Sequence, residues 1–131
     1  FGFMVENAES PAWGVTADLG TEISEIAAES ETPVLFVLLP TLHQVDRELA
    51  EKYRRAFGID PEAIDLDQPS SILRREFAAR GLDLVDLTQP MWRVQEEEGV
   101  RLYGKVDTHL SPEGHRVVAE LLERRVMELI E

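Results

Sequence analysis

Two hydrophobic periodicities, one helical and one typical of strands, alternate along the chain. Apolar residues recur at helical spacing over about residues 12–29, and they repeat every four residues from Val45 to Phe57. Segment 34–39 is continuously apolar, and segment 82–87 alternates between apolar and polar residues. We therefore expect helices in the first two segments and strands in the other two.

Start and stop signals predict the remaining elements. The apolar run at residues 1–5 predicts a first strand, and a third helix is expected to close at Gly81. A short helix over 89–98 should end at Gly99. The last helix is the clearest element, because Ser111 is a good N-cap directly before an apolar helical face.

This alternation of strands and helices predicts an α/β fold: a three-layer α/β/α sandwich with a parallel sheet, of the flavodoxin-like kind. A strand that is apolar on both faces, such as 34–39, belongs inside a sheet covered by helices on both sides. The length fits a single domain over residues 1–131. Because the chain opens within an apolar run and without an initiator Met, we expect the sandwich to be incomplete at its N-terminus.

Ligands of such folds bind beyond the carboxyl ends of the parallel strands. The loops expected there are 6–11, 40–44 and 86–90, and segment 104–111 can join them. His43 and Gln44 lie in the second loop and are candidate substrate contacts, with a hydrogen-bonded surface loop as the simpler alternative.

Composition excludes several classes of function. The formal net charge is −13, which disfavours nucleic acid and anionic membranes as partners. Cysteine is absent, so disulfides, zinc thiolate sites and cysteine nucleophiles are excluded. The longest apolar run, 34–39, is too short to span a bilayer. The compartment stays open, since the sequence does not exclude an upstream signal or anchor segment.

The candidate chemistry lies directly before the last helix. Asp107 and His109 are separated by one residue, which lets the carboxylate accept a hydrogen bond from one imidazole nitrogen. The other nitrogen is then free to act as a base, and the carboxylate stabilises the imidazolium that forms. An Asp at this position also commonly just caps a helix, so spacing alone leaves both interpretations open.

Residues 107–119, Asp-Thr-His-Leu-Ser-Pro-Glu-Gly-His-Arg-Val-Val-Ala, resemble the last conserved block of the SGNH hydrolases, the GDSL-type esterases and lipases. In that block an Asp and a His precede a C-terminal helix. Segments 33–40 and 81–87 are similar to two strands of the same family. The resemblance implies a serine acylhydrolase acting on small esters, with Asp107 and His109 as catalytic residues and no metal or organic cofactor.

The sequence departs from the family pattern in two ways. One residue separates Asp107 from His109, where the most familiar form of the block has two. No Gly-Asp-Ser nucleophile motif and no Gly-x-Ser-x-Gly elbow occurs, and Ser111 is better explained as a helix cap. The resemblance therefore implies a nucleophilic serine upstream of Phe1.

Asn7 stands where the family has a Gly-x-Asn-Asp block, although Val5 and Ala8 replace its Gly and Asp. The resemblance implies an oxyanion-hole role for Asn7, and a simple turn asparagine is an equal alternative.

Three other interpretations stay open. The chain can be a non-catalytic accessory or binding domain of the same fold, or an unrelated flavodoxin-like regulatory domain. Asp107, His109 and His43 can in principle bind a metal, although nothing in their spacing requires one. If strands are missing, an exposed sheet edge should promote self-association.

Overall fold

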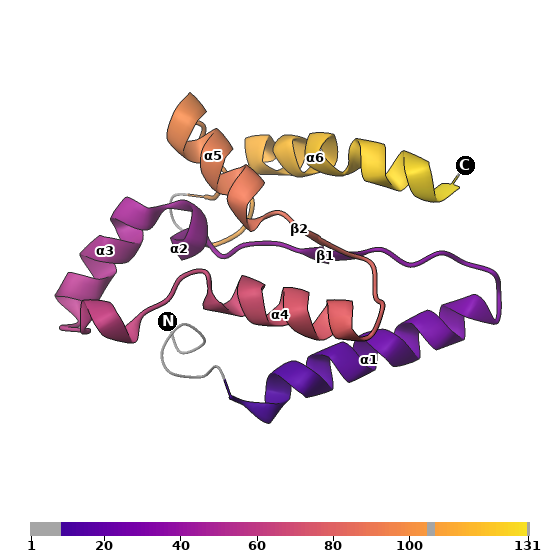
Figure 1. The fold of residues 1–131 in the computed structure, drawn as a ribbon. Helices are drawn as coiled ribbons and strands as arrows, with labels where there is room; N and C mark the ends of the chain where they lie inside the picture. Colours follow the sequence, from indigo (N-terminus) through magenta and orange to yellow (C-terminus); the bar gives the residue numbers. More distant parts are fainter. Residues whose placement is uncertain (1–8, 105–106, 131) are drawn as a thin grey trace. The chain divides into compact units, whose positions relative to one another are not determined.

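The computed structural model describes residues 9–104 and 107–130 and has a mixed α/β fold that is mainly helical (Figure 1). The elements, in chain order, are α1 (Pro11–Ala28), β1 (Phe36–Leu38), α2 (Leu42–Val45), α3 (Arg47–Ala56), the 3₁₀ turn η1 (Pro61–Ala63), α4 (Gln68–Ala79), β2 (Leu84–Asp86), α5 (Thr88–Glu98) and α6 (Pro112–Ile130).

The chain forms two compact units, each built from two separate stretches of sequence. Unit 1 comprises the residues up to Leu38 together with Asp60–Asp86, and it contains α1, β1, α4 and β2. Unit 2 comprises Leu39–Ile59 together with the residues from Leu87 onward, and it contains α2, α3, α5 and α6.

The sheet of unit 1 consists of β1 and β2, which run parallel in the register Phe36↔Leu84. The two predicted strands are confirmed in place, but each pairs over three residues only. The described residues do not form the three-layer sandwich. Val37 is 37% exposed, so β1 is not covered on both faces as its apolar sequence predicted.

Helices α1 and α4 lie side by side in unit 1 (Figure 1). A Cβ on Gly20 of α1 would lie 3.0 Å from Leu82 and 3.4 Å from Phe77, so a small residue is needed for this close approach. Phe77 in turn meets Phe36 of β1 edge-to-face, with ring centroids 5.2 Å apart. The core of unit 1 therefore forms where α1, α4 and β1 meet.

The helix over 12–29 is confirmed almost to the residue, but the predicted apolar face is not its buried face. Val15, Leu19, Ile23 and Ile26 are 51–67% exposed. The buried residues of α1 are Ala17 and Gly20. The helical periodicity correctly predicted that a helix forms. It did not predict the buried face, because small residues allow two helices to pack most closely, and here they face α4.

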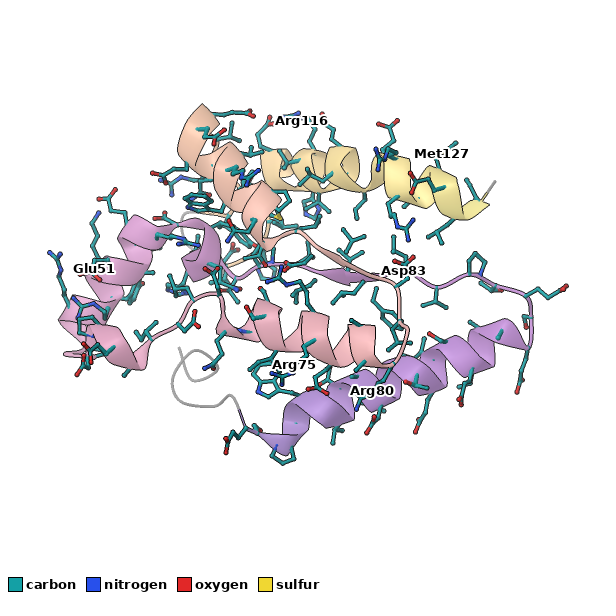
Figure 2. The ribbon with its side chains drawn as sticks, viewed as in Figure 1. Glu51, Arg75, Arg80, Asp83, Arg116 and Met127 are labelled. Atoms are coloured by element: carbon teal, nitrogen blue, oxygen red, sulfur yellow. The ribbon has the colours of Figure 1, made fainter. Side chains whose placement is uncertain are left out.

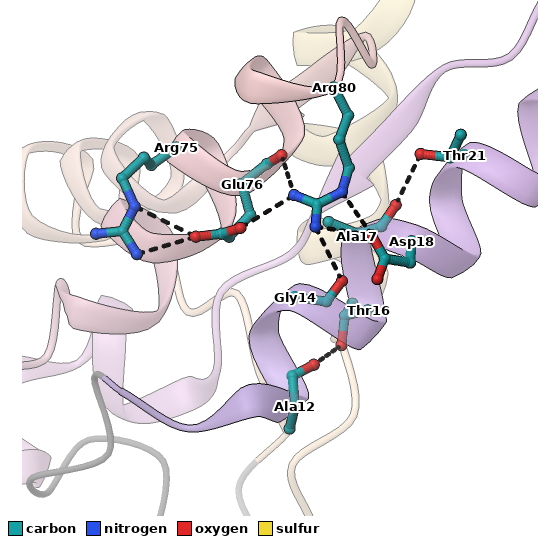
Figure 3. Close-up of polar contacts among 9 residues, drawn as sticks. All are labelled: Ala12, Gly14, Thr16, Ala17, Asp18, Thr21, Arg75, Glu76 and Arg80. Carbon is teal, nitrogen blue, oxygen red and sulfur yellow. Dashed lines mark hydrogen bonds and ion pairs between the residues drawn. The ribbon is translucent and has the colours of Figure 1, made fainter.

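A polar network joins α1 to α4 (Figure 3). Arg80 donates to the carboxylate of Asp18 at 2.8 Å and to that of Glu76 at 3.0 Å, and it reaches the carbonyl of Gly14 at 3.5 Å. Glu76 also accepts from Arg75, and these two arginines lower the pKa of its carboxyl group. The guanidinium of Arg80 thus links two helices that are far apart in the sequence.

The helix expected from Val45 to Phe57 is confirmed as α3, which starts two residues later than predicted because Asp46 separates it from the short helix α2. The Asp46 carboxylate accepts the N–H of Leu49 at 2.8 Å and so caps α3. The loop expected before Val45 is instead the helical turn α2. Its first turn is closed by the side chain of Gln44, which accepts from the N–H of Thr41 at 2.8 Å.

The outer face of α3 is charged, as Figure 2 shows around Glu51. Glu51 accepts hydrogen bonds from Arg54 and Arg55, and these bonds lower its pKa to about 2. Tyr53 and Phe57, expected in an apolar stripe, are both exposed. Only the start of the predicted stripe, at Val45, is buried in unit 2.

The start of α6 packs tightly on the segment that precedes it. A Cβ on Gly114 would overlap the carbonyl oxygen of Leu102, a fully buried residue. The predicted cap is confirmed, because Ser111 Oγ accepts the N–H of Gly114 at 3.0 Å. The end of α5 at Gly99 is also confirmed, with a left-handed φ of 66°.

Two helical glycines should respond oppositely to alanine. We expect Gly114→Ala to destabilise the chain by more than about 2 kcal/mol, because its methyl group overlaps backbone that must shift. The matched control is Gly14→Ala in α1, where the nearest atom to a Cβ is an Arg80 side-chain nitrogen 3.9 Å away. Gly14→Ala should stabilise by about 0.5–1 kcal/mol. Urea denaturation measures both, and equal effects would contradict this packing.

Candidate functional site

Asp107 and His109 lie beside an antiparallel bridge between two short segments, here named together the Asp–His hairpin (residues 102–104 and 107–111). Tyr103 and Leu110 form an antiparallel bridge between its arms. Gly104 donates its N–H to the carbonyl of His109 at 2.9 Å, and Ser111 donates to the carbonyl of Leu102 at 2.9 Å. These bonds fix the backbone on both sides of the Asp-x-His turn.

The Asp107 side chain folds back over the hairpin. Its Oδ1 accepts the backbone N–H of His109 at 3.2 Å. A Cβ on Gly104 would lie 2.6 Å from the same oxygen, so the absence of a side chain at Gly104 makes room for the carboxylate. The glycine before the Asp-x-His turn therefore has a steric role in placing Asp107.

The expected contact between Asp107 and His109 is present. Asp107 Oδ2 lies 3.4 Å from His109 Nδ1, and the two side chains are 62% and 87% exposed, respectively. No residue in the described part of the chain bonds to His109 Nε2. A pair this exposed contributes little to stability.

Ser111, the serine of this hairpin, is occupied as a cap. Its Oγ donates to the carbonyl of Arg101 at 2.8 Å and accepts the N–H of Gly114 at 3.0 Å. Attack on an ester would break both bonds and uncap α6. These bonds support the interpretation of Ser111 as a helix cap.

A cavity of about 410 Å³ lies beside the hairpin within unit 2. Its walls come from α2, α3, α5 and the Asp–His hairpin. Among its lining residues are His43, Asp46, Tyr53, Arg101, Asp107 and Thr108. The structure thus brings His43, a predicted substrate contact, to the same cavity as Asp107, whereas His109 does not line it.

The surroundings of His43 favour its neutral form. Burial lowers the pKa of its imidazole, and the nearby Asp46 carboxylate acts in the opposite direction. The ring packs edge-to-face on Tyr53, with centroids 5.2 Å apart. The imidazole of His43 therefore forms part of the cavity wall together with Tyr53.

Other residues that the sequence predicted for the site are not found at this cavity among the described residues. Gln44 is only 4% exposed, closes the first turn of α2 and does not line the cavity. Asn7 lies outside the described residues. Residues 9–104 and 107–130 contain no cluster of three or more Asp, Glu, His or Cys side chains that could bind a metal ion.

Two residues that sequence analysis missed hold the hairpin to the segment around α2. Tyr103, which is buried, donates its hydroxyl to the carbonyl of Pro40, and burial raises its pKa to about 12. Gln95 accepts from the N–H of Leu102 at 3.3 Å and donates to the carbonyl of Val45 at 3.4 Å. The position of Tyr103 directly before Gly104 is a sequence signal that could have indicated its role. The residues around Gln95 contain no comparable signal.

Comparison with known proteins adds no identification: no protein-family profile, curated protein or solved structure shows significant similarity to the chain. None of the helices in the described ranges has the length and apolar character needed to cross a membrane.

Replacing Ser111 tests its capping role. Ser111→Ala should cost about 1 kcal/mol of stability, because α6 loses its N-cap. Ser71→Ala, at an exposed position inside α4, is the matched control and should change stability by less than about 0.5 kcal/mol. Thermal denaturation measures both variants. Equal stability of Ser111→Ala and the wild type would contradict the cap.

Proposed function

We propose that the chain belongs to a serine ester hydrolase of the SGNH type, which removes acyl groups from small esters. The observation that carries the proposal is the contact at 3.4 Å between Asp107 Oδ2 and His109 Nδ1. The resemblance of residues 107–119 to the last block of that family supports it. In this proposal Asp107 orients the imidazole and stabilises its charged form.

The first half of the reaction forms an acyl-enzyme. A serine hydroxyl attacks the ester carbonyl carbon while His109 Nε2 takes the hydroxyl proton. Backbone amides stabilise the negative charge that develops on the carbonyl oxygen. The intermediate then collapses, the bond to the leaving alcohol breaks, and His109 returns the proton to that alcohol.

The second half regenerates the serine. Water, or the hydroxyl group of an acceptor, attacks the acyl carbon and gives its proton to His109 Nε2. The bond between the acyl carbon and the serine oxygen breaks, and His109 protonates the serine. The products are a carboxylic acid with water, or a new ester with an acceptor alcohol.

The proposal requires a serine that these 131 residues do not supply in a nucleophile motif. We place it in sequence upstream of Phe1. The same proposal includes two further roles. Asn7 donates to the oxyanion, and His43 contacts the substrate. A non-catalytic accessory domain of the same fold is the alternative, and the following experiment separates the two.

The natural full-length protein should form one covalent adduct with a fluorophosphonate serine probe, read by intact mass. His109→Ala should abolish the adduct, because the serine then lacks its base. His115→Ala, an exposed histidine of α6, is the matched control and should label normally. Peptide mapping should place the adduct upstream of Phe1. Absence of an adduct on the folded wild-type protein would favour the accessory-domain alternative.

The same proposal implies a larger fold than the two strands described. In a three-layer α/β/α sandwich, further parallel strands would flank β1 and β2, and helices would cover both faces. The parallel β1–β2 pair and the exposed apolar side chains of α1 support this arrangement.

We expect the isolated 131-residue chain to self-associate through the edge of β1 that pairs with no strand among the described residues. The Phe36 N–H is donated to Asp83, so strand alternation directs the Val37 N–H away from β2. Val37→Pro should therefore prevent association without breaking the β1–β2 ladder. Leu19→Lys, on the exposed face of α1, is the control and should leave association intact. Light scattering measures the mass, and a monomeric wild-type chain at high concentration would contradict the expectation.

A further inference from the structure

The cavity beside Asp107 contains charges of both signs, but its carboxylates already have partners. Asp46 accepts the N–H of Leu49 at 2.8 Å. Glu48 forms an ion pair with Lys52, also at 2.8 Å. Asp107 accepts from the N–H of His109 and contacts its imidazole. The negative groups of the cavity are therefore engaged within the protein.

Arg101 differs from these groups. Its side chain makes no hydrogen bond or ion pair with any residue in the described part of the chain, although Arg101 lines the cavity. Its backbone is firmly held, since its carbonyl accepts from Ser111 Oγ at 2.8 Å and the next residue, Leu102, is fully buried. The structure thus fixes the backbone of an exposed arginine at the cavity that Asp107 also lines, and its guanidinium donors have no partner among the described residues.

We propose that Arg101 binds an anionic group of the substrate, so that the esters cleaved carry a carboxylate or a phosphate-like group besides the acyl bond. This inference rests on the proposed function and names its substrate class. A guanidinium presents paired N–H donors that match the two oxygens of such an anion. A chain of net charge −13 repels anions in general, so selection of an anionic ester requires a local cation of this kind.

Lys52 is the second cation of this cavity, but it suits the role less well. Its ammonium group is paired with Glu48 at 2.8 Å, whereas Arg101 has no such partner among the described residues. A lysine also offers a point charge without the planar geometry of arginine. Arg101 is therefore the residue to which the structure assigns recognition of the anion.

The test compares esters that differ in charge, using the natural full-length protein. 4-Nitrophenyl acetate is the neutral substrate, and mono-4-nitrophenyl succinate and 4-nitrophenyl phosphonoacetate carry a carboxylate and a phosphonate. Arg101→Gln should lower kcat/KM for an anionic ester by about tenfold or more and change it less than about twofold for the acetate. Arg101→Lys should recover part of the loss. The two anionic esters show which anion the site prefers.

Arg93→Gln is the matched control, because Arg93 is an exposed residue of α5 that does not line the cavity. It should leave kcat/KM unchanged for all three esters. Equal losses for neutral and anionic esters in Arg101→Gln, or no loss for any of them, would overturn the inference while leaving the proposed hydrolase intact.

A binding measurement separates failure of the inference from failure of the proposed function. Methyl hydrogen succinate should protect Arg101, and not Arg93, from modification by phenylglyoxal, as read by peptide mass. This readout needs no catalysis. Lack of protection would overturn anion binding at Arg101. Failure of the wild-type protein to cleave any of the esters or to label with the serine probe would instead overturn the proposed function.

Discussion

The packing of the first turn of α6 against the backbone of Leu102 is the contact on which the candidate site depends. Only a glycine at position 114 lets the two backbones approach this closely. The same approach allows Ser111 to cap the helix and to hold the carbonyl of Arg101. The Asp–His hairpin is therefore fixed at its base by steric fit and by two hydrogen bonds of one serine.

Polar side chains then fix the hairpin against the segment around α2. The Tyr103 hydroxyl and the Gln95 amide bond to the carbonyls of Pro40 and Val45, respectively. Leaving a buried hydroxyl without a partner costs about 1–3 kcal/mol. Arrangements of the hairpin that break the Tyr103 bond are therefore disfavoured. The two contacts hold one wall of the cavity against the other, which is why a polar cavity persists beside Asp107.

Features of the fold that depend on neighbouring residues were predictable. Ser111 marks the start of α6 and Gly99 the end of α5, because caps and left-handed turns depend on a few adjacent residues. Features that depend on packing were not. Helix α1, for example, buries its small residues instead of Leu19 and Ile23.

The candidate site divides in the same way. The sequence alone predicted that Asp107 and His109 interact, because only one residue separates them, and the structure contains that contact. Only the tertiary structure decided that His43 and Arg101 share a cavity with Asp107. Those residues come from distant stretches of the chain, and their meeting depends on how helices and hairpin pack, which local sequence patterns do not encode.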